Sequence, residues 1–214
     1  DLENGGAGAP LTPIFHKLIV EQKKIEKPAI ILNLGGIANI THLAEDGISS
    51  TDIGPGNCLI DNWIKKKSPK KYDAEGSIAS VGKINNIILT KAIDLWKKKN
   101  KKFNHSLIRS YDIKDFNFPD INKLSLEDGA ATLTEYTSKI LADYFNKIKY
   151  HSKNKLIVCG GGRKNKFLVK KISEKIKYNI LPIDNFNIDG DFVESQAFAF
   201  LAIRSYLKLP ISFP

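Results

Sequence analysis

The sequence contains no methionine and only two cysteines, Cys58 and Cys159, which lie far apart in the chain. Since translation starts at methionine, we expect the 214 residues to be a fragment or a processed piece. Two distant cysteines exclude a disulfide framework and favour small buried thiols in a reducing cytoplasm. No apolar run approaches the roughly eighteen residues of a membrane span, and no basic-then-apolar leader is present, so we expect no membrane partner.

Arginine is scarce, because it occurs only at Arg109, Arg163 and Arg204 although the formal net charge is +10. Lysine therefore supplies nearly all of the positive charge. Arginine is the usual residue for bidentate phosphate contacts and for contacts to base edges. Neither zinc-finger spacing nor an aromatic RNA-binding pattern occurs. We therefore expect a solvated basic surface and no nucleic-acid partner.

Three short strands are predicted between Lys27 and Thr51. The segments "PAIILNL", "IANITHL" and "ISSTDI" are apolar or alternating and rich in β-branched residues. "GG" separates the first two and "EDG" precedes the third, and both are turn signals. This pattern predicts an antiparallel meander.

Helices and further strands follow the meander. Apolar spacing predicts helices over 57–67, 84–96 and 125–150, with Asn57 and Ser125 as N-caps. "KLIVCGGG" and "YNILPI" are predicted strands on either side of a helix over 167–176. The last helix, over 189–207, is apolar nearly all round, which indicates that it is buried. Residues 97–124 are expected to form a variable loop or insertion.

The element order favours an α/β fold. Three antiparallel strands followed by βα units predict a mixed sheet with helices on both faces. A ribonuclease-H-like lobe has this order, and so does each half of the actin-like ATPase fold. The specific fold rests on that analogy.

Three glycine-rich turns each follow a predicted strand: "NLGGIAN", "DIGPGN" and "VCGGGRKN". Glycine lets backbone N–H groups approach an anion closely, and a helix N-terminus attracts phosphate. The last two turns each end a strand and open a predicted helix, so Gly161 and Gly162 in one, and 54–57 in the other, are expected at a positive dipole end. Two glycines in a hairpin more often form an ordinary turn, whereas three glycines before a helix fit an ordinary turn and an anion site about equally well. A dinucleotide fingerprint is excluded by spacing, and the lysine of a Walker motif is absent.

Together and in this order, the motifs resemble those of the anhydro-N-acetylmuramic acid kinases, sugar kinases of the actin-like ATPase superfamily. The resemblance rests on "DLENGGAGAPLTPIFH", "LNLGGIANIT", "DIGPGNCLIDNW", "VCGGGRKN" and "GDFVESQAFAFLA". It implies an enzyme that hydrolyses the 1,6-anhydro ring of anhydro-N-acetylmuramic acid and phosphorylates O6, giving N-acetylmuramic acid 6-phosphate in peptidoglycan recycling. ATP and Mg²⁺ are the implied cofactors, and a homodimer is a possible assembly.

The resemblance also implies roles for individual residues. Asp1 heads the glycine-rich loop and is expected to be the catalytic general base. The ATP-binding residues are expected to be Gly35, Gly36, Asn39, Gly160, Gly161 and Gly162. The substrate-binding residues are expected to be Gly5, Gly6, Gly8, Asp52, Gly54, Gly56, Asn57 and Glu194. Two residues keep two interpretations each. Glu194 either helps to hold the sugar or only stabilises the N-terminus of its helix through the helix dipole. Asp52 either orients Mg²⁺-bound water or caps a turn. His16, between apolar neighbours, is interpreted as a packed histidine.

Two departures from the family pattern limit the resemblance. The family's N-terminal phosphate loop, of the form S-G-T-S-x-D-G, is missing here, and its "STGRE" segment reads "SYDIK" at 110–114. We therefore expect residues 1–214 to be a single C-terminal lobe of a two-lobe kinase that is inactive alone. The alternative hypothesis is a non-catalytic nucleotide-binding or interaction module on the same fold.

Overall fold

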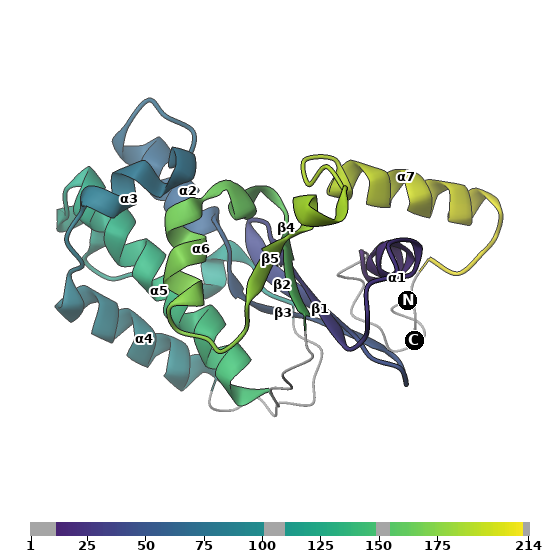
Figure 1. Cartoon of the computed structure of the whole chain (residues 1–214). Helices are drawn as coiled ribbons and strands as arrows, with labels where there is room; N and C mark the ends of the chain where they lie inside the picture. Colours follow the sequence, from purple (N-terminus) through teal and green to yellow (C-terminus); the bar gives the residue numbers. More distant parts are fainter. Residues whose placement is uncertain (1–11, 101–109, 149–154, 212–214) are drawn as a thin grey trace.

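A five-stranded mixed sheet forms the centre of the protein, with helices on both of its faces (Figure 1). The computed structural model describes residues 12–100, 110–148 and 155–211. The strands are β1 (Ala29–Leu34), β2 (Ile37–Leu43), β3 (Ile48–Pro55), β4 (Lys155–Cys159) and β5 (Ile180–Pro182). Their order in the sheet is β3-β2-β1-β4-β5.

The pairing confirms the predicted meander and the predicted fold class. β1 pairs antiparallel with β2, and β2 with β3, whereas β1 pairs parallel with β4, and β4 with β5. This order and these directions are those of a ribonuclease-H-like lobe. Since parallel neighbours carry their carboxyl ends to the same edge, the loops after β1 and β4 meet there.

Seven helices surround the sheet in the described part of the chain. They are α1 (Pro13–Gln22), α2 (Cys58–Lys67), α3 (Ser77–Val81), α4 (Asn86–Asn100), α5 (Leu126–Lys147), α6 (Lys166–Ser173) and α7 (Val193–Tyr206). α1 and α7 lie on one side of the sheet, and α2 to α6 lie on the other (Figure 1).

Strand β1 is buried on both sides because each face of the sheet carries its own hydrophobic core. Ile30 and Leu32 belong to the core that includes Trp63 of α2 and Phe145 of α5. Ile31, which points to the opposite face, belongs to the core beneath α1 and α7. Continuous apolar runs of this kind are typical of strands covered on both faces.

Helix α5 begins where its sequence predicts. The hydroxyl group of Ser125 accepts a hydrogen bond from the backbone N–H of Asp128 at 3.1 Å, as an N-cap does. The carboxylate of Asp128 accepts from the backbone N–H of Lys83 instead of closing a capping box. The start of α5 is therefore tied to the loop before α4.

Residues 110–124 hold only short 3₁₀ turns, which fits the predicted loop, but residues 97–100 do not belong to it, which corrects one end of the prediction. Residues 97–100 are the last turn of α4, which the helical pattern predicted to end earlier. Phe116 is buried, and its ring stacks on Trp96 at 5.3 Å, while Phe118 meets Tyr136 of α5 edge to face. Aromatic side chains thus pack residues 110–118 against the helices.

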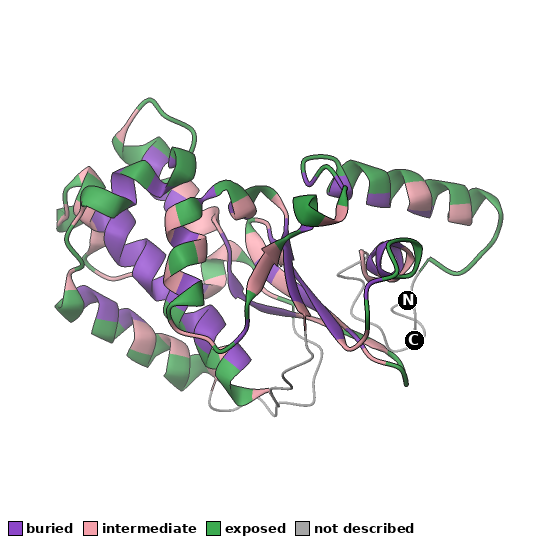
Figure 2. Cartoon of the chain, viewed as in Figure 1, coloured by how far each residue is buried: buried purple, intermediate pink, exposed green. Residues whose placement is uncertain are grey.

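Helix α7 is mostly exposed, so the prediction that it is buried is wrong (Figure 2). Only Val193, Ala197 and Leu201 of this helix are buried. Large apolar side chains on its other sides are open to solvent, with Ile203 exposed by 59% and Tyr206 by 87%. The apolar composition of α7 predicted its burial, but only one narrow stripe of this helix is covered, in part by α1.

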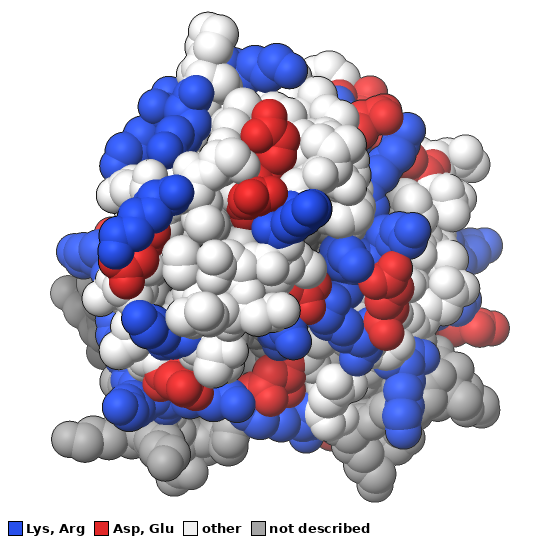
Figure 3. Space-filling model, turned by 90° about the vertical axis from the view of Figure 1, so that its left-hand side faces the viewer, with Lys and Arg blue, Asp and Glu red and all other residues white. Residues whose placement is uncertain are grey.

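The surface carries lysines interspersed with carboxylates, as the face over the larger helical layer shows (Figure 3). Several lysines pair with acids there, such as Lys99 with Asp115 and Lys175 with Glu135. Within the described ranges, no helix combines the length and hydropathy needed to cross a bilayer.

Candidate functional site

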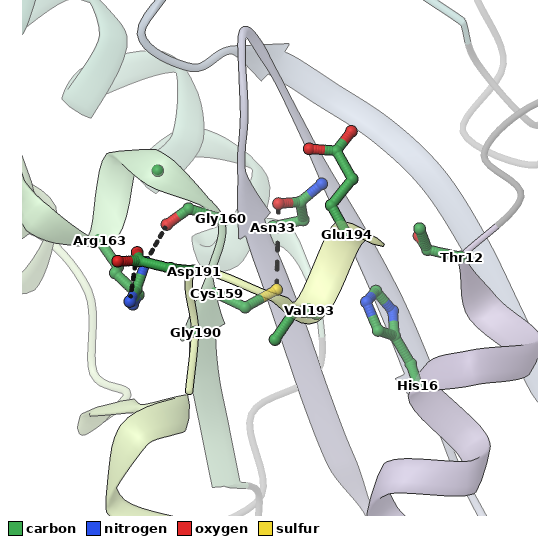
Figure 4. Close-up of a pocket in the computed structure, with 11 residues that line it drawn as sticks. Thr12, His16, Asn33, Cys159, Gly160, Arg163, Gly190, Asp191, Val193 and Glu194 are labelled. Carbon is green, nitrogen blue, oxygen red and sulfur yellow. Dashed lines mark hydrogen bonds and ion pairs between the residues drawn. The ribbon is translucent and has the colours of Figure 1, made fainter. Parts of the chain in front are cut away.

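A cavity of about 220 Å³ opens at the carboxyl edge of the sheet (Figure 4). α1, β1, the loop after β4 and the start of α7 each contribute side chains to it. Its lining consists of Thr12, His16, Asn33, Cys159, Gly160, Gly161, Arg163, Gly190, Asp191, Val193 and Glu194. Segments about 180 residues apart in the sequence therefore face one space.

The turn after β4 contributes Gly160 and Gly161 to the cavity, and the structure explains why it needs glycine. Gly160 has φ +78°, and a Cβ there would collide with the carbonyl of Leu34. At Gly162 a Cβ would lie 2.7 Å from Leu34 and 2.6 Å from the amide of Asn57. Gly161 faces open space, where a ligand can approach its backbone.

The same turn does not open directly into a helix, which corrects one expectation. Gly161–Lys164 forms a 3₁₀ turn, and α6 begins only at Lys166. The side chain of Asn165 caps α6 by accepting from the N–H of Leu168 at 3.0 Å. Gly161 and Gly162 therefore do not lie at the dipole end of α6.

The turns at Gly35–Gly36 and at 54–57 pack on each other. The N–H groups of Gly56 and Asn57 donate to the carbonyls of Gly36 and Gly35, each at 2.9 Å. A Cβ at Gly56 would collide with the carbonyl of Gly35. These N–H groups are thus used within the protein, and neither turn lines the cavity.

Gly54 also has a packing role in the structure. A Cβ there would lie 2.6 Å from Cγ2 of Ile140, so the glycine lets α5 approach β3 closely. Asn57 occupies the N-cap position of α2, but its side chain forms no capping hydrogen bond. The substrate-binding roles expected for Gly54, Gly56 and Asn57 stay predictions.

A row of polar side chains crosses the meander near the cavity. Asn33 on β1 pairs with Asn39 on β2, and Asn39 pairs with Asp52 on β3. Directly paired residues point to the same face of a sheet, so the three side chains share one face. Asn33 lines the cavity, and the Oδ1 atom of Asn39 is buried with no hydrogen-bond partner.

Asp52 joins this row to the segment after residue 109. Its Oδ2 atom accepts a hydrogen bond from the backbone N–H of Tyr111 at 2.8 Å. Burial raises the pKa of the Asp52 carboxyl, and the Tyr111 hydrogen bond opposes that rise. The carboxylate thus holds the aromatic segment, which is a structural role beside the one expected from the resemblance.

His16 is buried, as its apolar neighbours indicate, but it also lines the cavity. Its Nδ1 atom is 2.7 Å from the hydroxyl oxygen of Thr41 on β2. Burial lowers the pKa of His16 to about 4, so the imidazole is neutral near pH 7. A neutral ring next to the cavity offers hydrogen bonding without charge.

Glu194 lies in the first turn of α7 with its side chain exposed at the cavity (Figure 4). Both interpretations of this residue fit the geometry. A carboxylate in the first turn stabilises a helix through its interaction with the helix dipole. The same carboxylate faces a space that a sugar hydroxyl can enter.

Arg163 and its partners were missed by sequence reasoning. Its guanidinium contacts Asp184 and Asp191, each with a shortest distance of 2.9 Å. The hydrogen bonds from Arg163 lower the pKa of the Asp184 carboxyl. The pKa of the Asp191 carboxyl is lowered mostly by its hydrogen bond from Lys164 and next by that from Arg163. The sequence did contain a signal for Arg163, because this residue follows three glycines and is one of only three arginines in the chain.

Asp1, Gly5, Gly6 and Gly8 lie outside the described residues. Among the residues that the structure describes, no group of three or more His, Cys, Asp or Glu side chains comes together as a metal site. Cys58 and Cys159 are both free thiols, and burial raises their pKa values to about 11 and 12. Cys159 is fully buried, as predicted, and Cys58 is partly buried.

Comparison with solved structures finds weak likeness. The activator of the 2-hydroxyisocaproyl-CoA dehydratase from Clostridium difficile, with bound ADPNP, matches with a TM-score of 0.49 and 14% identity. The match covers 79% of this chain and 57% of that one.

Comparison with sequences is far stronger. Anhydro-N-acetylmuramic acid kinases of Pelagibacter ubique and Zymomonas mobilis are 47% and 38% identical over all of this chain. The chain spans 58% and 57% of the length of these two relatives. A sequence model of the family described as anhydro-N-acetylmuramic acid kinase matches residues 1–214. The chain therefore belongs to the anhydro-N-acetylmuramic acid kinase family.

Proposed function

We propose that this chain forms one lobe of an ATP-dependent kinase acting on anhydro-N-acetylmuramic acid. The enzyme opens the 1,6-anhydro ring with water and transfers the γ-phosphoryl group of ATP to O6. The product is N-acetylmuramic acid 6-phosphate. Family membership over the whole chain supports this proposal.

The observation that carries the proposal is the convergence at the cavity. Gly160 and Gly161, expected to bind ATP, and Glu194, expected to bind the sugar, line the same space. Phosphoryl transfer depends mainly on positioning and on charge stabilisation, so its two substrates must meet. A cavity that brings a glycine turn and the carboxylate of Glu194 together fits that need.

The polar groups at the cavity fit a carbohydrate. Asn33, neutral His16 and the carboxylate of Glu194 offer hydrogen-bond donors and acceptors. Ligand sites usually fix orientation with a few polar groups of this kind. We assign the sugar to the part of the cavity between α1 and the start of α7.

Ring opening requires a base for the attacking water. We assign this role to Asp1, whose carboxylate would accept a proton from the water as it attacks the anomeric carbon. The bond from that carbon to O6 then breaks, and O6 becomes free to attack phosphorus. Gly5, Gly6 and Gly8 follow Asp1 closely and are proposed to let the backbone approach the sugar.

ATP supplies the phosphoryl group when bound. The residues proposed to hold it are Gly35, Gly36, Asn39, Gly160, Gly161 and Gly162. Of these, Gly161 fits best, since no atom lies within 4 Å of a Cβ placed there.

Two buried amide oxygens near the turns fit Mg²⁺ chemistry. In the described part of the chain, Oδ1 of Asn39 and Oδ1 of Asn57 are buried and have no partner. Such oxygens accept hydrogen bonds from a metal-bound water or a sugar hydroxyl. Mg²⁺ usually keeps several waters and takes few protein ligands, and Asp52 is the nearby carboxylate we propose for orienting them.

The test is product analysis with a full-length family member that carries these residues. With ATP and the anhydro sugar, wild-type enzyme should give the 6-phosphate, detected by mass spectrometry. Asp1→Asn should abolish ring opening and phosphorylation together, because both follow from the same proton transfer. Asp46→Asn, in an exposed turn, is the matched control and should retain activity. Phosphorylation by Asp1→Asn enzyme would assign the base to another residue.

We further propose that activity needs the part of the family's length that this chain does not cover. The 214-residue chain alone should then show no turnover, while addition of the remaining segment as a separate polypeptide restores it. Turnover by the chain alone at an ordinary kinase rate would overturn this. A cytoplasmic location and a homodimer accompany the proposal as expectations.

A further inference from the structure

One buried guanidinium connects two of the segments that line the cavity. Arg163 directly follows the Gly160–Gly162 turn, and its side chain is only 7% exposed. Its Nε and Nη2 atoms donate to the two oxygens of Asp184 at 2.9 and 3.2 Å. Such bidentate contact fixes the plane of the guanidinium as well as its position.

Arg163 also donates to both of these segments. Nη1 donates to the carbonyl oxygen of Gly160 at 3.3 Å, which belongs to the glycine turn. Nη2 also donates to Oδ1 of Asp191 at 2.9 Å, and Asp191 lies two residues before the start of α7. Figure 4 shows Arg163 joined by dashed lines to both Gly160 and Asp191, at one side of the cavity.

The segment before α7 is built around this side chain. At Gly190 a Cβ would collide with the guanidinium of Arg163, so any larger residue would displace this guanidinium from its observed position. The N–H of Gly190 donates to Oδ1 of Asp184 at 3.2 Å. Lys164 adds a second contact to the carboxylate of Asp191. Together these bonds fix the backbone three residues before Glu194.

We propose that Arg163 is a positioning residue, which holds the Gly160–Gly162 turn and Glu194 at a fixed separation for the two substrates. This inference rests on the proposed function, in which that turn binds ATP and Glu194 binds the sugar. Arg163 acts through the backbone on either side of it. The planar, five-donor guanidinium is required, since an ammonium group cannot make bidentate contact with Asp184 while reaching Gly160 and Asp191.

The first test is a double-mutant cycle in a full-length family member that carries these residues. Arg163→Lys should lower kcat/KM on the order of 100-fold, because small displacements of reacting groups cost that much. In a Glu194→Gln background the same change should cost much less, because the group that Arg163 positions is already altered. Arg204→Lys, at the far end of α7, is the matched control and should leave kcat and KM unchanged.

Additive effects of Arg163→Lys and Glu194→Gln would overturn the inference, because a purely structural role lowers the folded fraction equally in both backgrounds. An unchanged kcat/KM in Arg163→Lys enzyme would overturn it as well.

A second measurement needs no kinase activity, so it separates this inference from the proposed function. Amide hydrogen exchange of the 214-residue chain reports local opening. Arg163→Lys should raise exchange at 160–162 and at 190–196, while β1 and α5 keep their protection. Unchanged exchange at those segments would overturn the inference even if the enzyme is the proposed kinase. Inactive wild-type protein with the expected exchange pattern would overturn only the proposed function.

Discussion

The Nδ1 atom of His16 lies 2.7 Å from the hydroxyl oxygen of Thr41, and this contact joins α1 to β2 in the protein interior. Both residues are buried, with His16 exposed by 1%. The pair ties the helix at the cavity to the meander, and it keeps an ionisable ring away from solvent.

This burial predicts that stability falls in mild acid. The pKa of His16 is about 4 in the folded protein and 6.5 ordinarily, so between these pH values the unfolded chain binds the extra proton. Stability is therefore full above pH 6.5 and is lost progressively toward pH 4, by up to about 3 kcal/mol. Urea unfolding at several pH values measures the loss. His16→Gln should remove this part of the dependence, and an identical pH profile in that variant would contradict the prediction.

The two glycines of the turn after β4 should respond differently to alanine. Gly162→Ala should lower the free energy of unfolding by about 1–3 kcal/mol, since the new methyl group overlaps Leu34 and Asn57. Gly161→Ala should leave stability nearly unchanged, because its Cβ meets nothing within 4 Å. Chemical denaturation of both variants provides the comparison. Equal losses would show that the turn packs differently.

Helix α5 should tolerate no side chain at Gly129. A Cβ there would lie 2.5 Å or closer to the indole of Trp63, whose Nε1 donates to the carbonyl of Leu126 at 2.8 Å. Gly129→Ala should therefore destabilise the protein by about 1–3 kcal/mol despite the better helix propensity of alanine. Thermal unfolding measures the change. Gly47→Ala, in an open turn, is the control, and a stabilised Gly129→Ala variant would refute the packing argument.

The exposed and buried sides of α7 should differ sharply in their cost of substitution. Leu201 is 7% exposed, so Leu201→Ala should cost about 2–5 kcal/mol. Ile203 is 59% exposed, so Ile203→Ala should change stability by no more than about 0.5 kcal/mol. Both variants remove aliphatic groups from one helix, and urea unfolding compares them. Similar losses would mean that a further surface covers α7 in solution.

The sequence alone was sufficient for the local elements of the fold. Alternating and apolar runs separated by glycine turns predicted the meander, because side-chain direction in a strand repeats every two residues. Ser125 predicted the start of α5, because capping depends on residues three apart. The order of these elements was enough to indicate the ribonuclease-H-like lobe and, with the motifs, the family.

Only the tertiary structure decided which surfaces meet. The contacts of Arg163 with Asp184 and Asp191 join residues that are 21 and 28 positions apart, and no local pattern encodes such a pairing. The exposure of α7 likewise depends on what packs over it, which its own apolar residues do not specify. Glycines at 54 and 56 were predicted to bind the sugar and the glycine at 162 to bind ATP, and these roles stay predictions. The structure adds that all three allow close packing of neighbouring segments, which is a property of the assembled chain.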